Sequence, residues 1–98
     1  MSLVVLDLNN PAFLNDWFQL EKAEAMAVLD ILRKIRGMEW DLVYRDRGLR
    51  WETIISRKGP AGQRIYSLRI TRKVRATAYR DGEYLRFLSL HPDHDSAT

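Results

Sequence analysis

The sequence contains no cysteine and only two histidines, His91 and His94, among its 98 residues. The lack of cysteine excludes a disulfide scaffold, a thiolate metal site and a cysteine nucleophile. Two histidines are too few for a conventional zinc site, and we expect no metal and no other cofactor. No apolar run reaches the roughly 18 residues of a spanning helix, and residues 1–8 lack the pattern of a signal peptide. The sequence therefore predicts a soluble cytoplasmic protein without a membrane segment.

The size and composition predict one folded domain over residues 1–98. The mass is 11.5 kDa, hydrophobic residues make up 46% of the chain and charged residues 30%. These values are close to those of ordinary globular proteins and far from those of disordered chains. A chain of this length is long enough to bury one core and too short for two.

The net charge of +3 is unevenly distributed along the chain. Residues 1–44 carry four basic and seven acidic side chains, whereas residues 45–86 carry twelve basic and four acidic ones, a net charge of +8. Ten of those twelve cations are arginine, whose planar guanidinium binds phosphate or carboxylate in two places. The second half therefore indicates a polyanion as the first partner to consider.

The first part of the chain predicts a strand followed by a helical hairpin. Leu3–Leu8 is a short apolar run rich in β-branched residues. Asn10 before Pro11 is typical of a helix start, with an Asx cap and proline at the first helical position. The helical period continues to residue 36, where one straight helix would be nearly 40 Å long. We expect two helices instead, joined between Gln19 and Lys22.

The middle of the chain has the weakest periodicity. Met38–Lys58 shows no regular pattern, although a short helix or strand around Thr53–Ser56 fits the residues. Gly48–Glu52 is interpreted as a loop held by two buried apolar anchors. Gly59–Gly62 predicts a turn or flexible loop.

Three strand-like runs follow one another from Arg64 to Leu90. Asp81-Gly82 is a two-residue turn of the kind that needs positive φ, and Arg80 and Glu83 flank it as a cross-strand pair. The pairs expected from this turn are Tyr79–Tyr84, Ala78–Leu85, Thr77–Arg86 and Ala76–Phe87. A three-residue turn at Thr71–Lys73 would pair Ile70–Val74, Arg69–Arg75 and Leu68–Ala76.

Side chains alternate across a sheet, so these pairings sort the strands into two faces. The face expected to pack against the helices carries Tyr66, Leu68, Ile70, Val74, Ala76, Ala78, Leu85 and Phe87. The opposite, polar face carries Ser67, Arg69, Arg75, Thr77, Arg86, Tyr79 and Tyr84, with Leu88 and Leu90 at its far end. The fold class is therefore α+β, with two helices on one face of a twisted antiparallel sheet.

The polar face places like charges opposite one another. Arg69 opposes Arg75, and Arg86 would lie diagonal to Arg75 with all three guanidinium groups on one face. Directly opposed cations destabilise a sheet unless an anion bridges them. Two readings follow: the arginines bind a polyanion, or they turn to solvent and pair with Glu52 or the C-terminal aspartates.

Four segments in this order resemble the RelE/ParE superfamily of toxins from toxin–antitoxin pairs. They are Gly48-Leu49-Arg50-Trp51-Glu52, Ile65-Tyr66-Ser67-Leu68-Arg69-Ile70, Val74-Arg75-Ala76 and His91-Pro92-Asp93-His94-Asp95-Ser96-Ala97. The last is similar to the family's closing His-Asp-x-x-Tyr. The resemblance implies a RelE-like fold with a short N-terminal strand.

The resemblance also implies a function. Members of the RelE branch cut messenger RNA in the ribosomal decoding site without a metal, because the RNA 2′-hydroxyl is the nucleophile. Carried over by position, Arg75 is the phosphate-stabilising arginine, Arg69 an upstream basic residue, and His94 a general acid or base. The further residues expected to bind RNA are Arg86, Tyr79, Tyr84, Arg72 and Lys73.

The sequence departs from the family pattern at its end, where Thr98 stands in place of tyrosine. Base stacking or proton transfer would then come from Tyr79, from Tyr84 or from a residue elsewhere in the chain. A ParE-like inhibitor of DNA gyrase, which needs no nuclease residues, fits the same fold, and so does a small basic domain that binds RNA or protein without cutting. The expected partners are a cognate antitoxin with an acidic, disordered tail, the ribosome and its messenger RNA, or gyrase in the alternative.

Overall fold

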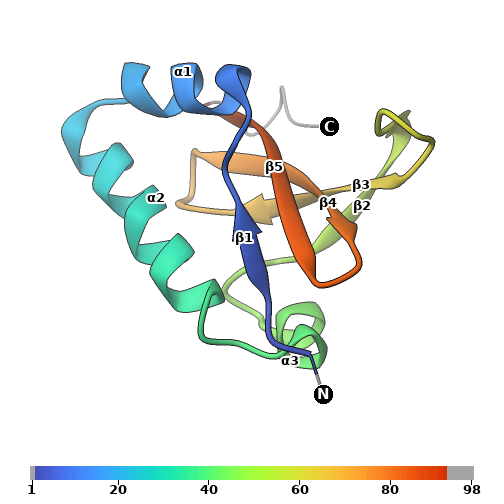
Figure 1. Cartoon of the computed structure of the whole chain (residues 1–98). Helices are drawn as coiled ribbons and strands as arrows, with labels where there is room; N and C mark the ends of the chain where they lie inside the picture. The colour runs from blue at the N-terminus through green and yellow to red at the C-terminus, as the bar shows by residue number, and fades with distance from the viewer. Residues whose placement is uncertain (1, 93–98) are drawn as a thin grey trace.

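The computed structural model describes residues 2–92, which have a mixed α+β fold. Three helices precede most of a five-stranded sheet (Figure 1). The elements are β1 (Val5–Asp7), α1 (Pro11–Gln19), α2 (Lys22–Ile35), α3 (Trp40–Arg45), β2 (Glu52–Lys58), β3 (Arg64–Arg69), β4 (Arg75–Asp81) and β5 (Tyr84–His91). No helix in this part of the chain is long and apolar enough to span a membrane.

The sheet has the strand order β1-β5-β4-β3-β2, so the first strand lies beside the last. β1 runs parallel to β5, and the other neighbours are antiparallel. The short N-terminal strand is thus confirmed. The mostly antiparallel sheet is confirmed as well.

The helical hairpin is confirmed, and its start has the expected cap. The Asn10 side-chain oxygen accepts hydrogen bonds from the backbone N–H groups of Ala12 (2.9 Å) and Phe13 (3.4 Å). α1 ends where Leu20 takes an extended conformation, and α2 begins two residues later. The short helix α3 was not predicted from the sequence. Its six residues are too few to show a helical period, and Glu39 at its start makes no side-chain cap.

The core lies between the two long helices and the face of the sheet that was predicted to be apolar. Phe13 of α1 packs on Phe87 of β5 with ring centroids 5.1 Å apart. Ala76 and Ala78 are fully buried, and their small side chains leave room for the helices. The strand and loop residues of this core include Leu68, Ile70, Val74, Ala76, Ala78, Leu85 and Phe87. The predicted packing face is confirmed for these residues.

The hairpin registers show one correct prediction and one error. Arg69 pairs with Arg75 and Leu68 with Ala76, as expected from the Thr71–Lys73 turn. In the next hairpin the turn is Gly82-Glu83, because Asp81 already pairs with Tyr84. Of the two turn residues, Gly82 has positive φ (62°) and Glu83 does not, which matches a turn that needs glycine at its first position.

The expected Arg80–Glu83 pair is therefore wrong, and Arg80 lies opposite Leu85. The pairing differs from the predicted one by two residues along β5. Because side chains alternate with a period of two, this shift changes partners without exchanging the faces.

The prediction for the end of β5 is wrong, because the strand contains a β-bulge. Ala78 pairs with Phe87, but Thr77 pairs with Ser89, so Leu88 is an extra residue on β5. The extra residue reverses the alternation beyond it. Leu90 was expected on the polar face and is instead a core residue, 4% exposed.

The fold predicts that Ala76 has no room for a larger side chain. The Ala76→Leu variant should lose about 1 to 3 kcal/mol of unfolding free energy through overpacking, measured by urea denaturation. The matched control is Ala12→Leu at an exposed position of α1, which should leave stability nearly unchanged. Equal stability of both variants would contradict the packing described above.

Candidate anion-binding site

The candidate site is built on one row of the polar face. Arg69 of β3, Arg75 of β4 and His91 of β5 lie directly opposite one another across the three strands. Arg75 is the first residue of β4, not a mid-strand residue. Arg86 was expected to lie near Arg75 on the next strand. It lies opposite Tyr79 instead, and the residue opposite Arg75 on β5 is His91. The predicted group of three arginines is thus wrong in its third member.

The Arg75 side chain is nearly buried, with 8% of the residue exposed. One guanidinium nitrogen, Nη2, donates to Ser67 Oγ at 2.8 Å and to the Arg50 carbonyl at 3.3 Å. The same nitrogen lies 3.9 Å from a carboxylate oxygen of Glu52, which is half exposed. Within residues 2–92, Nε of Arg75 is buried and has no hydrogen-bond partner. A buried cation with this little compensation favours binding of an anion.

A cleft of about 280 Å³ lies at this point and is lined almost entirely by arginine. Its lining residues are Arg50, Arg69, Thr71, Arg72 and Arg75, and we call it the arginine cleft. Four guanidinium groups around one small space repel one another at any pH at which proteins fold. An anion such as phosphate would remove this repulsion and accept charge-assisted hydrogen bonds.

The loop before β2 positions one wall of this cleft. Leu49 is fully buried in the core, and its carbonyl accepts from Arg69 N at 2.7 Å. Leu49 N donates to Asp46 Oδ1 at 3.0 Å, which holds the loop from its other side. Arg50 follows with φ of 46°, a conformation that non-glycine residues rarely adopt. Strain of this kind is concentrated at functional sites, so it adds to the evidence for this cleft.

His91 is the candidate residue that the sequence reasoning did not assign. Its Nε2 is 3.0 Å from Ser89 Oγ, which in turn shares a short hydrogen bond with Thr77 Oγ1. Burial lowers the pKa of His91 below 6.5, and the charge of Arg57 adds to this, against the opposing effect of Asp16. Its neutral form therefore dominates at pH 7, which suits a proton acceptor. Only the bulge at Leu88 brings His91 to this face.

Arg86 was predicted to bind RNA, but its charge is already balanced. Arg86 forms ion pairs with Asp7 of β1 and, at 3.0 Å, with Asp81. Its guanidinium also lies over the ring of Tyr84, 4.7 Å from the centroid. These bonds to Asp7 and Asp81 raise the pKa of Arg86 further above its usual value. The pKa of Asp7 is lowered by a backbone hydrogen bond from Asn9 and by Arg86, against the opposing effect of burial.

The other predicted residues are dispersed over the surface. Arg72 lines the arginine cleft, and Lys73 is exposed in the same turn. Tyr79 is half-buried opposite Arg86, and Tyr84, the first residue of β5, is 45% exposed. His94 lies outside the described residues. Across residues 2–92, no three histidine, aspartate or glutamate side chains gather closely enough to hold a metal ion.

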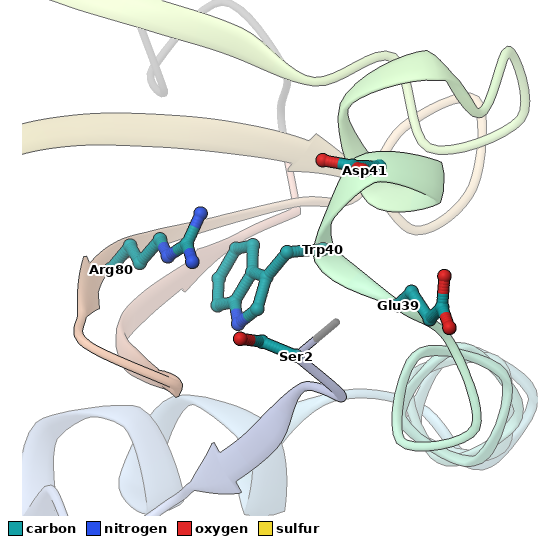
Figure 2. Close-up of a pocket in the computed structure, with 5 residues that line it drawn as sticks. All are labelled: Ser2, Glu39, Trp40, Asp41 and Arg80. Atoms are coloured by element: carbon teal, nitrogen blue, oxygen red, sulfur yellow. The ribbon is translucent and has the colours of Figure 1, made fainter.

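A second hollow, of about 210 Å³, contains another arginine but a different charge balance (Figure 2). Here the Arg80 guanidinium lies over the indole of Trp40, 4.2 Å from the centroid, and donates to Tyr44 Oη at 2.9 Å. Glu39 and Asp41 also line this hollow. Two carboxylates beside one arginine make it a poor site for an anion. The arginine cleft is therefore the stronger candidate.

The environment of His91 predicts its titration. In the folded chain, an NMR titration of the imidazole should give a midpoint below 6.5, whereas the chain in denaturant should titrate near 6.5. Since the unfolded chain binds the proton more readily, the contribution of His91 to stability is present above pH 6.5 and is lost as the pH falls through the folded midpoint. A folded midpoint at or above 6.5 would contradict the burial of the ring.

Comparison with known proteins gives a result for the fold only. No protein-family model matches the chain, and no curated protein matches it. An archaeal RelE from a RelE–RelB complex of Pyrococcus horikoshii OT3 is 16% identical, with a TM-score of 0.62 over 94% of this chain and 96% of that chain.

Two further solved structures are similar. A YoeB dimer from Staphylococcus aureus is 16% identical, with a TM-score of 0.51 over 92% of this chain and 94% of that one. A copper-bound mutant toxin from Helicobacter pylori is 16% identical, with a TM-score of 0.52 over the whole of both chains. The α+β architecture and these neighbours identify the fold of this protein as that of the RelE-like type II toxins.

Proposed function

We propose that this protein is the toxin of a type II toxin–antitoxin pair and that it inhibits translation by cutting messenger RNA on the ribosome, without a metal. The observation that carries the proposal is the arginine cleft, in which a nearly buried Arg75 sits among three other arginines. Its position on a RelE-like fold, on the face of the sheet away from the helices, supports this reading.

The chemistry that suits this cleft is transfer of an RNA phosphate to the neighbouring 2′-oxygen. The 2′-oxygen forms a bond to phosphorus and the bond to the 5′-oxygen breaks, leaving a cyclic phosphate and a free 5′-hydroxyl. Negative charge gathers on the phosphoryl oxygens in the transition state. Arg75 and Arg69 would stabilise it, because the sheet and the Ser67 hydroxyl hold Arg75 in place before RNA arrives.

His91 is the group we assign to proton transfer. It lies opposite Arg75, and its lowered pKa leaves it neutral at pH 7. A neutral imidazole can take the proton from the 2′-hydroxyl, while the departing 5′-oxygen takes one from solvent. This role replaces the one expected for His94 by resemblance. Tyr79 and Tyr84, on the same face, are the aromatic residues available for base stacking in place of a C-terminal tyrosine.

An antitoxin with an acidic tail is the partner we propose for the same cleft. The RelE of Pyrococcus horikoshii was solved in complex with RelB. In this chain, Arg72 and Lys73 extend the basic surface beyond the cleft, where carboxylates of a disordered segment would find partners on folding. The bound tail would cover Arg75 and keep RNA out.

A ParE-like action on DNA gyrase and simple binding without cleavage remain the other candidates. Neither requires a buried arginine in an anion cleft opposite a neutral histidine, and this pair of residues favours the nuclease. The same experiments separate them. Primer extension on cellular messenger RNA detects cleavage, and a supercoiling assay with purified gyrase detects inhibition.

Substitution of Arg75 tests the catalytic assignment. If the chain cleaves RNA, Arg75→Ala should lower the cleavage rate by on the order of 10²-fold or more. Removal of one preorganised hydrogen-bond donor lowers the rate by about this factor in comparable sites. The measurement is primer extension after induction in cells, with growth arrest as a second readout.

Two further variants make this test specific. Arg69→Ala should also lower cleavage. It removes no side-chain hydrogen bond found in residues 2–92, so we expect the variant to keep its fold. Arg36→Ala, an exposed arginine beyond the end of α2, is the matched control and should cleave normally. Circular dichroism verifies the fold of each. An Arg75→Ala protein as toxic as the parent would reject the catalytic role.

Reversal of charge at the cleft tests the antitoxin proposal. Arg72→Glu should weaken binding of the protein encoded by the adjacent reading frame by about tenfold or more, since carboxylates would then face a carboxylate. Isothermal titration calorimetry measures the affinity, and Arg36→Glu controls for the change in net charge. Toxicity that is unaffected by co-expression of that neighbour would contradict the proposal.

A further inference from the structure

The most exposed apolar surface of the helical hairpin lies far from the arginine cleft. Phe18 at the end of α1 is 77% exposed, and Met26 of α2 is 49% exposed. Between them is a groove of about 350 Å³ whose lining is mostly apolar. The lining residues are Trp17, Phe18, Leu20, Lys22, Ala25, Met26 and Leu29. Large exposed aromatic and aliphatic side chains grouped in this way mark an interaction surface.

The charges beside this surface have a symmetrical arrangement. Lys22, Met26 and Asp30 are four residues apart on α2, so they form one row along the helix. All three are exposed, and in the described part of the chain neither Lys22 nor Asp30 takes part in an ion pair. The row therefore has a cation at one end, an anion at the other and a methionine in the centre.

We propose that this surface binds a second copy of the chain, with the two α2 helices antiparallel about a two-fold axis at Met26. In that arrangement, a residue that precedes Met26 by some number of positions faces the residue of the partner copy that follows Met26 by the same number. Lys22 of each copy then faces Asp30 of its partner, and the two Met26 side chains meet in the centre. A surface that complements itself in this way is what a two-fold interface requires.

The residues next to the row suit close packing of two helices. Ala23 is exposed three residues before Met26, and its small side chain lets the helix axes approach. Phe18 stands beside the row at the rim of the groove, where contact with the partner would remove it from water. Two copies brought together on this axis thus bury the apolar patch of each and form two ion pairs.

The proposed interface leaves the candidate site accessible. α2 packs its buried residues, including Val28 and Leu32, against the sheet, and its opposite side faces away from the molecule (Figure 1). Arg75 is on the far face of the sheet. The dimer would therefore present two open arginine clefts, and this inference does not depend on the proposed nuclease function.

The oligomeric state tests the proposal. Sedimentation velocity of the purified full chain should show a monomer–dimer equilibrium that depends on concentration, and Met26→Lys should shift it to monomer. Ile55→Lys, at an 89% exposed isoleucine on β2, is the matched control and should leave the equilibrium unchanged. A chain that stays monomeric at every concentration, or a dimer that survives Met26→Lys, would overturn the proposal.

Exchange of the two charges gives the sharper test. Lys22→Asp alone and Asp30→Lys alone should each weaken the dimer by about tenfold or more, because like charges then face one another at both ends. The double variant carrying both changes restores opposite charges and should dimerise like the parent. Failure of this rescue in a double variant that is folded by circular dichroism would count against the antiparallel pairing.

Discussion

The β-bulge at Leu88 decides which side chains of β5 face the helices and which lie on the polar face of the sheet. Before the bulge, Leu85 and Phe87 point to the core; after it, Leu90 does. The reversed alternation completes the hydrophobic core at the end of the strand and at the same time places His91 on the polar face, opposite Arg75 in the sheet register. Core packing and the candidate chemistry therefore depend on one extra residue, which explains why a bulge is tolerated in the interior of this sheet.

Arg75 is the point at which stability and function oppose each other. Its guanidinium is nearly buried, with a hydroxyl, a carbonyl and a distant carboxylate as partners. Placing a cation there costs free energy that a hydrophobic residue would not, so the fold alone does not account for it. The strained Arg50, whose carbonyl helps to hold Arg75, adds to that cost. An anionic ligand would offset both, which is the physical basis of the proposed site.

The uneven charge along the chain is partly neutralised by the fold. β1, from the acidic half, lies beside β5, so Asp7 pairs with Arg86 from the basic half. Lys34 and Asp46 also form an ion pair, at 3.1 Å, but here the cation comes from the acidic half and the anion from the basic half. Arg80 is placed over Trp40 on α3. Part of the remaining positive charge gathers around the arginine cleft, and another part lies at β2 and β3, where Arg57, Lys58 and Arg64 line a separate hollow.

The sequence by itself determined the features that depend on neighbouring residues. Asn10-Pro11 started α1, the Thr71–Lys73 turn set the pairing of Arg69 with Arg75, and alternation separated the core face from the polar face. Only the tertiary structure decided the rest. A bulge has no signature in the β5 sequence, so the positions of Leu90 and His91 could not be predicted, and the pairing of Arg86 with Asp7 joins residues 79 positions apart. Local steric and hydrogen-bonding preferences act within a few residues, whereas these contacts form only when the whole sheet closes on its helices.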